Sequence, residues 1–225
     1  MLPPIPEKLR KIDDSTVGEH FSLDGFDRCY YIWEYAARKR YDFSPANQLV
    51  FNLKIKPSAI AKTPARNRYK LEAIAHAGTA LRSLITRVFV ETRATFVPIP
   101  CSKAVADPDY DARLSRVLAR AFHGWGADVR EMLTLTQSTP ADHESVERLS
   151  FDELLAITQL TDQVGTAPRP VIVIVDDVLN SGKHFKVAQS LIKARYANAE
   201  VRGIFLARCV REPVEFDGPP GPIGG

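Results

Sequence analysis

The sequence predicts an α/β protein: a parallel sheet flanked by helices, with a helical N-terminal extension. Residues 171–175 form an unbroken run of β-branched side chains, which is typical of a strand buried on both faces. Strand-like segments alternate with segments of helical period, the order found in parallel sheets with right-handed crossovers. The 225 residues are enough for one full-sized domain with a substantial core and an extension.

The first 64 residues are expected to form an arm and a helical extension. Residues 1–20 are rich in proline and polar side chains at their start, and are predicted to be a loosely attached arm. Four apolar side chains then have the spacing of one helical face: Phe26, Tyr30, Trp33 and Ala37. Residues 44–69 mix an apolar patch with prolines and basic side chains, and are predicted to be irregular.

The main α/β domain is expected at 65–212, beginning with a helix, a strand at 94–100 and a second helix. The first helix is predicted by an apolar face made of Leu71, Ile74, Ala75, Gly78, Leu81, Ile85 and Val88. The second is predicted by Tyr110, Leu114, Val117, Leu118, Ala121, Phe122 and Trp125. Arg113, Arg116 and Arg120 fall on the solvent side of that helix, although Arg113 is within reach of the strand ends from the first turn.

The second half of the domain contains the strand at 171–177, a helix and a last strand at 200–210. Residues 133–150 are polar with little apolar period and are predicted to be a mobile loop, and 151–160 a brief helix or strand. The helix after the strand is predicted by Phe185, Ala188, Leu191 and Ile192. The tail at 213–225 is rich in glycine and proline and is predicted to be disordered.

Composition narrows the class of protein only broadly. The net charge of +3 favours an anionic partner weakly and does not separate a small phosphate from nucleic acid. The three cysteines, Cys29, Cys101 and Cys209, are far apart and form neither a disulfide framework nor a metal-binding pattern. No leader-like start and no apolar run of membrane-spanning length occurs, so a cytoplasmic protein without a membrane partner is expected.

Two adjacent aspartates, Asp176 and Asp177, follow the apolar strand and precede a short polar loop. The loop consists of Asn180, Ser181, Gly182, Lys183 and His184. Ligands of open parallel sheets bind beyond the carboxyl ends of the strands. There the amino end of the next helix favours an anion, the loop's glycine lets the backbone approach a phosphate, and its serine and lysine add a hydroxyl and a charge. Two carboxylates would repel a bare phosphate, but they suit a ligand with a phosphate at one end and vicinal hydroxyls, with or without Mg²⁺, at the other. A 5-phosphoribosyl group has that layout.

The segment IVIVDDVLNSGKH resembles the signature of the type I phosphoribosyltransferases: an apolar strand, two acids, two apolar residues and a Thr/Ser-Gly-x-Thr loop. The likeness covers roughly 70–210 and implies that family's parallel sheet. It also implies that Asp176 and Asp177 hold the ribose hydroxyls of phosphoribosyl pyrophosphate (PRPP), that 180–184 holds its 5-phosphate, and that Mg²⁺ meets the two acids through substrate or water. By the same likeness, TFVPIPCSK contains the pyrophosphate loop, whose lysine would neutralise the leaving pyrophosphate. That loop consists of Pro100, Cys101, Ser102 and Lys103.

Residues 133–150 stand where the family has a flexible hood loop, and resemble the Gln…Arg pattern of its ComF-like branch. That likeness points to Gln137 and Arg148. The closing GIFLAR also resembles the last core strand of the ComF-like branch. The RGFNQ stretch typical of that branch is missing from this sequence, and Arg113 lies near the position where it would stand.

Two residues depart from the family signature. Asn180 stands where purine-salvage members have an aspartate that serves as a base, and an amide cannot take a proton. His184 replaces a hydroxyl residue that binds the 5-phosphate; a protonated imidazole would donate in its place, or its bulk would close the pocket. A nucleotide hydrolase is excluded because no GxxxxGK[ST] precedes the acids. Cys101 is not predicted to be a nucleophile, since no histidine is placed to activate it.

Two functions therefore stay open. The first is transfer of a phosphoribosyl group from PRPP, with Mg²⁺, to an unidentified base or other nucleophile. The second is a catalytically inactive module that binds PRPP or a nucleoside monophosphate and acts on a protein or nucleic-acid partner through the N-terminal extension. The basic stretches ARKR and KTPARNR and their neighbouring tyrosines suit nucleic acid, but a basic rim around packed helices explains them equally well. The oligomeric state stays open, a homodimer included.

Overall fold

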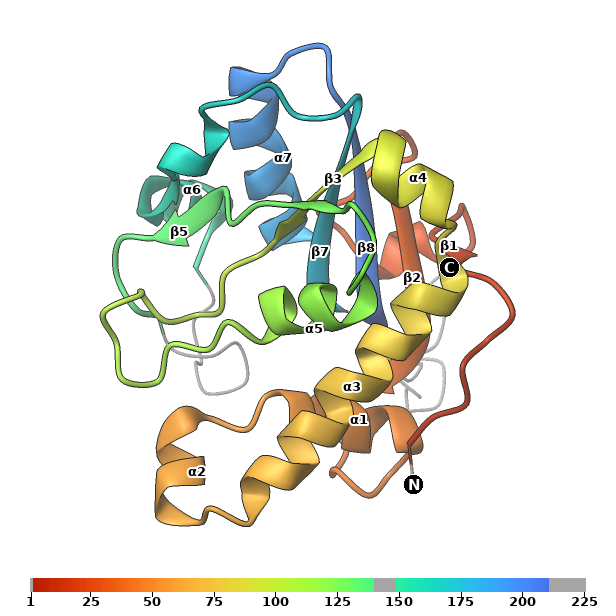
Figure 1. Cartoon of the computed structure of the whole chain (residues 1–225), viewed down its shortest axis with the longest axis vertical. Coiled ribbons are helices and arrows are strands. Elements are labelled where there is room, and N and C mark those ends of the chain that lie inside the picture. Colours follow the sequence, from red (N-terminus) through yellow and green to blue (C-terminus); the bar gives the residue numbers. More distant parts are fainter. Residues whose placement is uncertain (1, 140–148, 211–225) are drawn as a thin grey trace, which may run out of the picture.

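A computed structural model describes residues 2–139 and 149–210 (Figure 1). Its main sheet has six strands in the order β1-β2-β8-β7-β3-β4. The strands are β1 (Arg10–Lys11), β2 (Arg28–Ala36), β3 (Ala94–Pro98), β4 (Asp128–Val129), β7 (Val171–Leu179) and β8 (Glu200–Val210). Every neighbouring pair is parallel except β1 with β2. The predicted α/β class, with a mostly parallel sheet, is confirmed.

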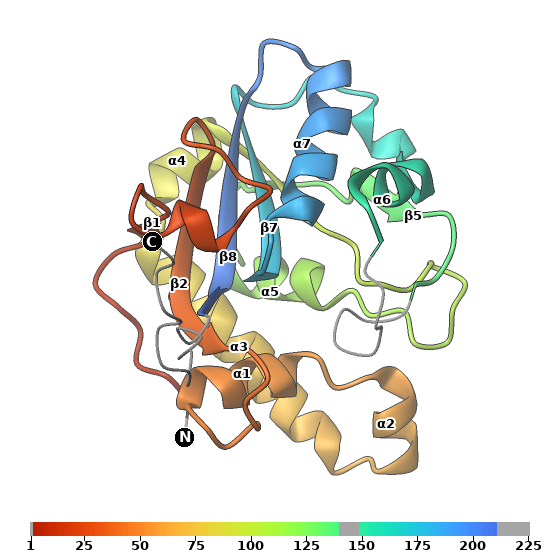
Figure 2. The same ribbon diagram turned by 180° about the vertical axis from the view of Figure 1, so that it is seen from behind.

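Helices cover both faces of the sheet (Figures 1 and 2). Val171, Val173 and Val175 of β7 belong to a core shared with α1 (Pro45–Leu53), α3 (Arg66–Leu84) and α5 (Arg113–Ala121). Ile172 and Ile174, which point to the other face, share a second core with α7 (Lys183–Arg195). Because both faces are buried, β7 reads as a continuous apolar run rather than an alternating one.

Shorter elements complete the described fold. They are the helices α2 (Pro57–Lys62), α4 (Arg87–Thr92) and α6 (Phe151–Ile157), and two 3-10 turns, η1 (Val17–Glu19) and η2 (Asp162–Val164). Strands β5 (Leu133–Leu135) and β6 (Thr158–Leu160) pair antiparallel in a small separate sheet beside α7. None of the helices in the described ranges combines the length and apolar character that crossing a bilayer requires.

The helix expected from Phe26 is wrong, because residues 28–36 form strand β2 inside the main sheet. β2 pairs with β8 along nearly its whole length and with β1 on its other edge. The side chains of Cys29, Tyr31, Ile32 and Trp33 are all buried. A strand that is covered on both faces has no alternation, so its aromatic side chains matched a helical spacing by chance.

The expected loose arm at 1–20 and the expected irregular segment at 44–69 are also ordered and packed where the structure describes them. In the expected loose arm, the Ile12 amide donates to the Cys29 carbonyl at 2.9 Å and the Trp33 indole donates to the Pro4 carbonyl at 2.8 Å. In the segment 44–69, α1 and α2 each begin with proline in the first turn, a position where a missing N–H costs nothing. Strand β2 and helix α1 thus join the core of the main domain instead of standing apart as an extension.

The remaining elements agree with prediction more closely. Strands β3, β7 and β8 and helices α3, α5 and α7 all occur, with α3 ending at Leu84 and α4 following it. The segment 151–160 is a helix followed by a strand, and β5 begins the expected loop at 133–150. Most of that loop, 140–148, and the tail at 213–225 lie outside the described residues.

Candidate functional site at the carboxyl end of β7

Asp176 and Asp177 follow the apolar run of β7 and point to opposite faces of the sheet. Both are buried, with exposed fractions of 8% and 3%. Asp176 Oδ1 accepts the Asp177 amide at 2.7 Å, and its Oδ2 lies 3.9 Å from Nδ1 of His184 in the first turn of α7. The strand end therefore presents one carboxylate toward α7 and one toward α1, α3 and α5.

Two cations hold Asp177. Arg113, the first residue of α5, donates from Nε at 2.8 Å and from Nη2 at 2.5 Å to Oδ2. Lys54, just after α1, lies with Nζ 3.0 Å from Oδ1. The solvent-side position expected for Arg113 is wrong: the first turn of α5 faces the end of β7, and the side chain is only 15% exposed. Lys54 was missed, because the helix before it was not predicted.

The charged cluster extends away from β7 into the helical layer. Asp111 Oδ2 accepts from Arg113 at 3.4 Å and lies 2.6 Å from Nζ of Lys70 on α3. Lys70 is 2% exposed and also donates to the carbonyls of Leu53 and Ile55, at 3.0 and 2.6 Å. These contacts fix Arg113 and the end of α1, and so fix both cations that reach Asp177.

The two acids differ in their affinity for a proton. Burial and the neighbouring Asp177 carboxylate raise the pKa of Asp176 to about 7. For Asp177, burial acts in the same direction but is outweighed by Lys54 and Arg113, which hold its pKa well below its usual range. The strand end thus carries one permanent carboxylate and one group, Asp176, that exchanges a proton near neutral pH.

The loop 180–184 is braced by the N-terminal segment. Gly182 caps α7 with φ +88°, and a Cβ on it would lie 2.6 Å from the Leu23 side chain. The Ser22 amide donates to the Ser181 carbonyl at 2.9 Å, and Nδ1 of His20 contacts the Asn180 carbonyl. The lack of a side chain at Gly182 was predicted to let a phosphate approach the backbone. In the structure, the space where that side chain would stand is occupied by Leu23.

Helix α7 begins directly after Gly182. The first amides of a helix have no carbonyl partner within the helix, and the dipole places partial positive charge there. The Lys183 amide lies 3.3 Å from Ser181 Oγ. The Lys183 ammonium donates to the Leu149 carbonyl, so it lies toward the segment that was expected to be a hood.

The expected pyrophosphate loop, Pro100–Lys103 by sequence, follows β3 and lies next to the end of β7, since the Ile99 amide donates to the Val175 carbonyl at 2.9 Å. Lys103 Nζ donates to the Thr139 carbonyl at 3.2 Å, and the Thr139 amide donates to the Ser102 carbonyl at 2.7 Å. The loop is thus tied to residues 138–139. Of the two hood residues, Gln137 is exposed and Arg148 lies outside the described residues.

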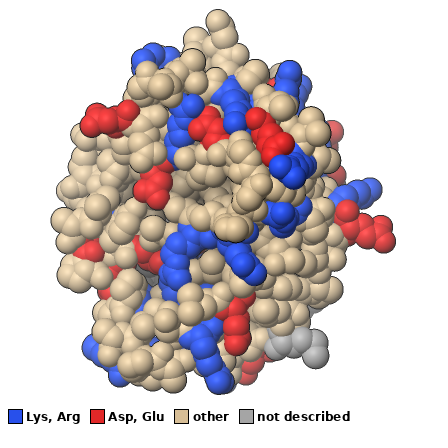
Figure 3. All heavy atoms as spheres, viewed as in Figure 1, with Lys and Arg blue, Asp and Glu red and all other residues tan. Residues whose placement is uncertain are grey.

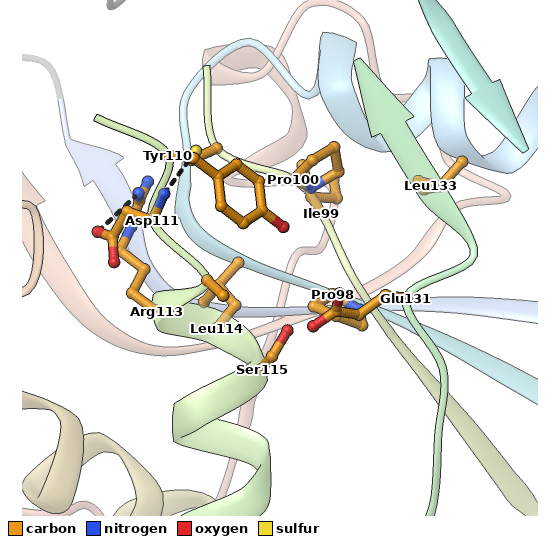
Figure 4. A pocket seen from close by; sticks show the side chains of 12 residues that line it. Pro98, Ile99, Pro100, Tyr110, Asp111, Arg113, Leu114, Ser115, Glu131 and Leu133 are labelled. Carbon is orange, nitrogen blue, oxygen red and sulfur yellow. Dashed lines mark hydrogen bonds and ion pairs between the residues drawn. The ribbon is translucent and has the colours of Figure 1, made fainter. Parts of the chain in front are cut away.

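A hollow opens between the carboxyl end of β3 and the start of α5 (Figure 4). Cys101 and Pro100 of the expected pyrophosphate loop line one part of it, and Asp111 and Arg113 of the charged cluster line another. This hollow could not be predicted from local sequence patterns, because residues from β3, α5 and the start of β5 meet there only in the folded chain.

The two aspartates do not fit direct coordination of Mg²⁺. Both oxygens of Asp177 are engaged by cations, which would repel a metal ion, and one oxygen of Asp176 accepts a backbone amide. Among the described residues, no group of three or more His, Cys, Asp or Glu side chains is placed to hold a metal ion.

The surrounding surface is of mixed charge. Figure 3 shows basic side chains over α3, α4 and α5 with acidic ones among them. No protein-family model matches the chain, and no curated protein is significantly similar to it. The likeness to phosphoribosyltransferases thus rests on the sequence motif.

Proposed function

We propose that the chain is a phosphoribosyltransferase-like protein that binds a 5-phosphoribosyl group at the carboxyl end of β7 and transfers it from PRPP to an acceptor. One observation carries the proposal. Two adjacent buried aspartates lie near the carboxyl end of a central parallel strand and are followed within a few residues by the amino end of a 13-residue helix. That order places hydroxyl acceptors beside an anion site, as a ribose 5-phosphate requires.

We assign a task to each part on the basis of its contacts. Asp176 Oδ2 is within reach of a ribose hydroxyl. Asp177 Oδ1 contacts Lys54 and could also accept a hydrogen bond from a ribose hydroxyl, because a carboxylate oxygen accepts more than one hydrogen bond. The amides of the first turn of α7 would receive the 5-phosphate. Chemistry of this kind needs mainly orientation and stabilisation of the departing pyrophosphate, for which Lys103 and Lys54 would supply positive charge. A Mg²⁺ ion would be coordinated by the pyrophosphate of the substrate rather than by these carboxylates.

A second candidate is a non-catalytic module that binds PRPP or a nucleoside monophosphate. The pairing of Asp177 with both Lys54 and Arg113 favours it, because a ligand must break a buried ion pair before it reaches that acid. Asn180, which cannot act as a base, favours it too. Ligand binding to such a module would change its interaction with a protein or nucleic-acid partner.

A thermal-shift experiment tests binding for both candidates. PRPP with Mg²⁺, ribose 5-phosphate and nucleoside monophosphates should raise the melting temperature; a ligand at 100 times its Kd stabilises by about 2.7 kcal/mol, or roughly 5–10 °C for a chain of this size. Asp177→Asn should abolish the shift, and the exposed Asp14→Asn should keep it. If none of these ligands raised the melting temperature, both candidates would be ruled out. Release of pyrophosphate from PRPP with a panel of nucleobases then separates them: release supports the transferase, and binding without release supports the module.

A further inference from the structure

The segment from the end of α1 to the start of α3 combines charge of one sign with exposed aromatic side chains. No Asp or Glu occurs between Asp42 and Glu72, whereas that stretch contains six Lys and Arg residues. It lies almost wholly before 70–210, the part of the chain that resembles phosphoribosyltransferases, so that likeness predicts nothing about it. Helix α2 and the start of α3 lie at one end of the molecule, beyond the sheet (Figures 1 and 2).

Three of the six basic side chains are held by the fold, and three are exposed. Lys54 and Lys70 pair with aspartates of the charged cluster, and Lys56 is half-buried. The exposed three, here called the α2–α3 cations, are Lys62, Arg66 and Arg68. Among the residues that the structure describes, none of these three forms an ion pair, and the nearest acid in the sequence, Glu72, stands one turn after Arg68. Positive charge that no carboxylate neutralises attracts an anionic partner.

Aromatic side chains stand beside these cations. The guanidinium carbon of Arg68 lies 4.5 Å from the centroid of the Tyr69 ring, and Arg68 Nη2 donates to the Tyr69 hydroxyl at 2.7 Å. Tyr69 is 40% exposed, and Phe51, near the end of α1, is 43% exposed. Helix α1 ends beside the first turns of α3, because Lys70 Nζ donates to the Leu53 carbonyl at 3.0 Å. Both rings therefore lie at the same end of the molecule as the cations.

This combination selects among anionic partners. Any polyanion could pair with the cations, but an exposed aromatic ring also offers a surface on which a nucleobase stacks. The faces of bases in a duplex are already covered by their neighbours, whereas those of a single strand are open. A lipid surface supplies phosphate groups but no bases. The cations and rings together therefore favour a single strand.

We propose that the α2–α3 cations and Tyr69, with Phe51 beside them, bind single-stranded nucleic acid. The cations would contact backbone phosphates, and the rings would stack on bases. The inference does not rest on the proposed function, because the ribose-phosphate site is built from other residues. Failure of either proposal leaves the other standing.

Fluorescence anisotropy with labelled single strands of DNA and RNA of about 20 nucleotides, and with the matching DNA duplex, tests the proposal. The wild type should bind at least one single strand with a Kd of about 1–100 µM at physiological salt, and more tightly than the duplex. The triple variant Lys62→Gln, Arg66→Gln, Arg68→Gln should weaken this binding at least about tenfold. It should also reduce the slope of log K against log salt by about 2, since each phosphate contact to a single strand accounts for about 0.7.

A matched control separates this surface from net charge. The triple variant Arg93→Gln, Lys193→Gln, Arg195→Gln removes the same charge from exposed positions elsewhere and should bind like the wild type. Tyr69→Ala should weaken the single strand by roughly fivefold or more and leave the duplex unchanged, whereas Tyr69→Phe keeps the ring and should bind normally. The three cations replaced one at a time provide the test if the triple variant does not fold.

Four results would overturn the proposal. Equal losses in the two triple variants would mean that binding follows net charge alone. A duplex bound as tightly as the single strands, with no effect of Tyr69→Ala, would remove the stacking surface. Binding to vesicles of phosphatidylserine and phosphatidylcholine, with none to the oligonucleotides, would assign the cations to a lipid surface. No binding of any oligonucleotide at about 50 mM salt, where phosphate contacts are strongest, would leave the surface without a nucleic-acid partner.

Discussion

Replacing Asp176 by asparagine should make the protein more stable at high pH and remove a pH dependence of its stability. The pKa of Asp176 is raised from 3.8 to about 7 by burial and by Asp177, with Lys54 and Arg113 acting in the opposite direction and His184 3.9 Å away. Between about pH 4 and 7 the folded protein therefore holds a proton that the unfolded chain releases. The free energy of unfolding should fall as the pH rises through this window, and the loss should be complete above the folded pKa.

The size of this effect follows from the pKa difference. About three pH units correspond to roughly 4 kcal/mol, which is a ceiling because the carboxylate can shift toward water or His184 when it ionises. Asparagine has the same shape and can still accept the Asp177 amide hydrogen bond, which is 2.7 Å long. We therefore expect Asp176→Asn to gain about 2–4 kcal/mol over the wild type at pH 8, and little at pH 4.

Urea unfolding at pH 4, 5, 6, 7 and 8 measures the difference directly. The exposed variant Asp14→Asn serves as the matched control for loss of one carboxylate. A difference between wild type and Asp176→Asn that is the same at every pH would refute the reasoning, since it would mean that Asp176 takes up no extra proton on folding.

Three further predictions follow from the contacts around the site. Gly182→Ala should lower the free energy of unfolding by about 2–4 kcal/mol, from strain at φ +88° and overlap with Leu23, and Leu23→Ala should recover part of the loss in a double-mutant cycle. Lys70→Met should cost about 3–5 kcal/mol in urea unfolding, because it leaves Asp111 and two carbonyls without their buried cation; an equally stable variant would show that the cluster is not coupled. Binding of ribose 5-phosphate should persist in excess EDTA, because the two aspartates are proposed to bind the ribose without a metal ion. Loss of binding in EDTA would contradict that proposal.

The strands that bear the candidate site were predictable because their sequence signals are local. Residues 171–175 can be little else than a doubly buried strand, and the aspartates and glycine that follow are close enough in sequence to be read together. The same physics misled the prediction at β2, where Tyr30 and Trp33, with Phe26 and Ala37 on either side, also fit a helical spacing. The unbroken apolar run from Cys29 to Trp33 was the signal to weigh against that spacing.

The partners of Asp177 could not be predicted in the same way. Its spacing puts Arg113 on the solvent side of α5, but the first turn of that helix packs against the end of β7, which the sequence does not reveal. Lys54 follows a helix that begins at Pro45, and the sequence alone does not distinguish a proline that breaks a helix from one in a first turn capped by Ser44. Lys70 looks like any lysine of an amphipathic helix; only the fold shows that it is buried on Asp111.

The most direct test of a 5-phosphoribosyl site is titration of ¹⁵N-labelled protein with ribose 5-phosphate, followed through the backbone amide resonances. We expect the largest shifts at the amides of Gly182, Lys183 and His184, with a saturable dependence on ligand, and loss of these shifts in Asp177→Asn. Shifts confined to other surfaces, or none at millimolar ligand, would contradict the proposal that the end of β7 and the start of α7 bind a ribose phosphate.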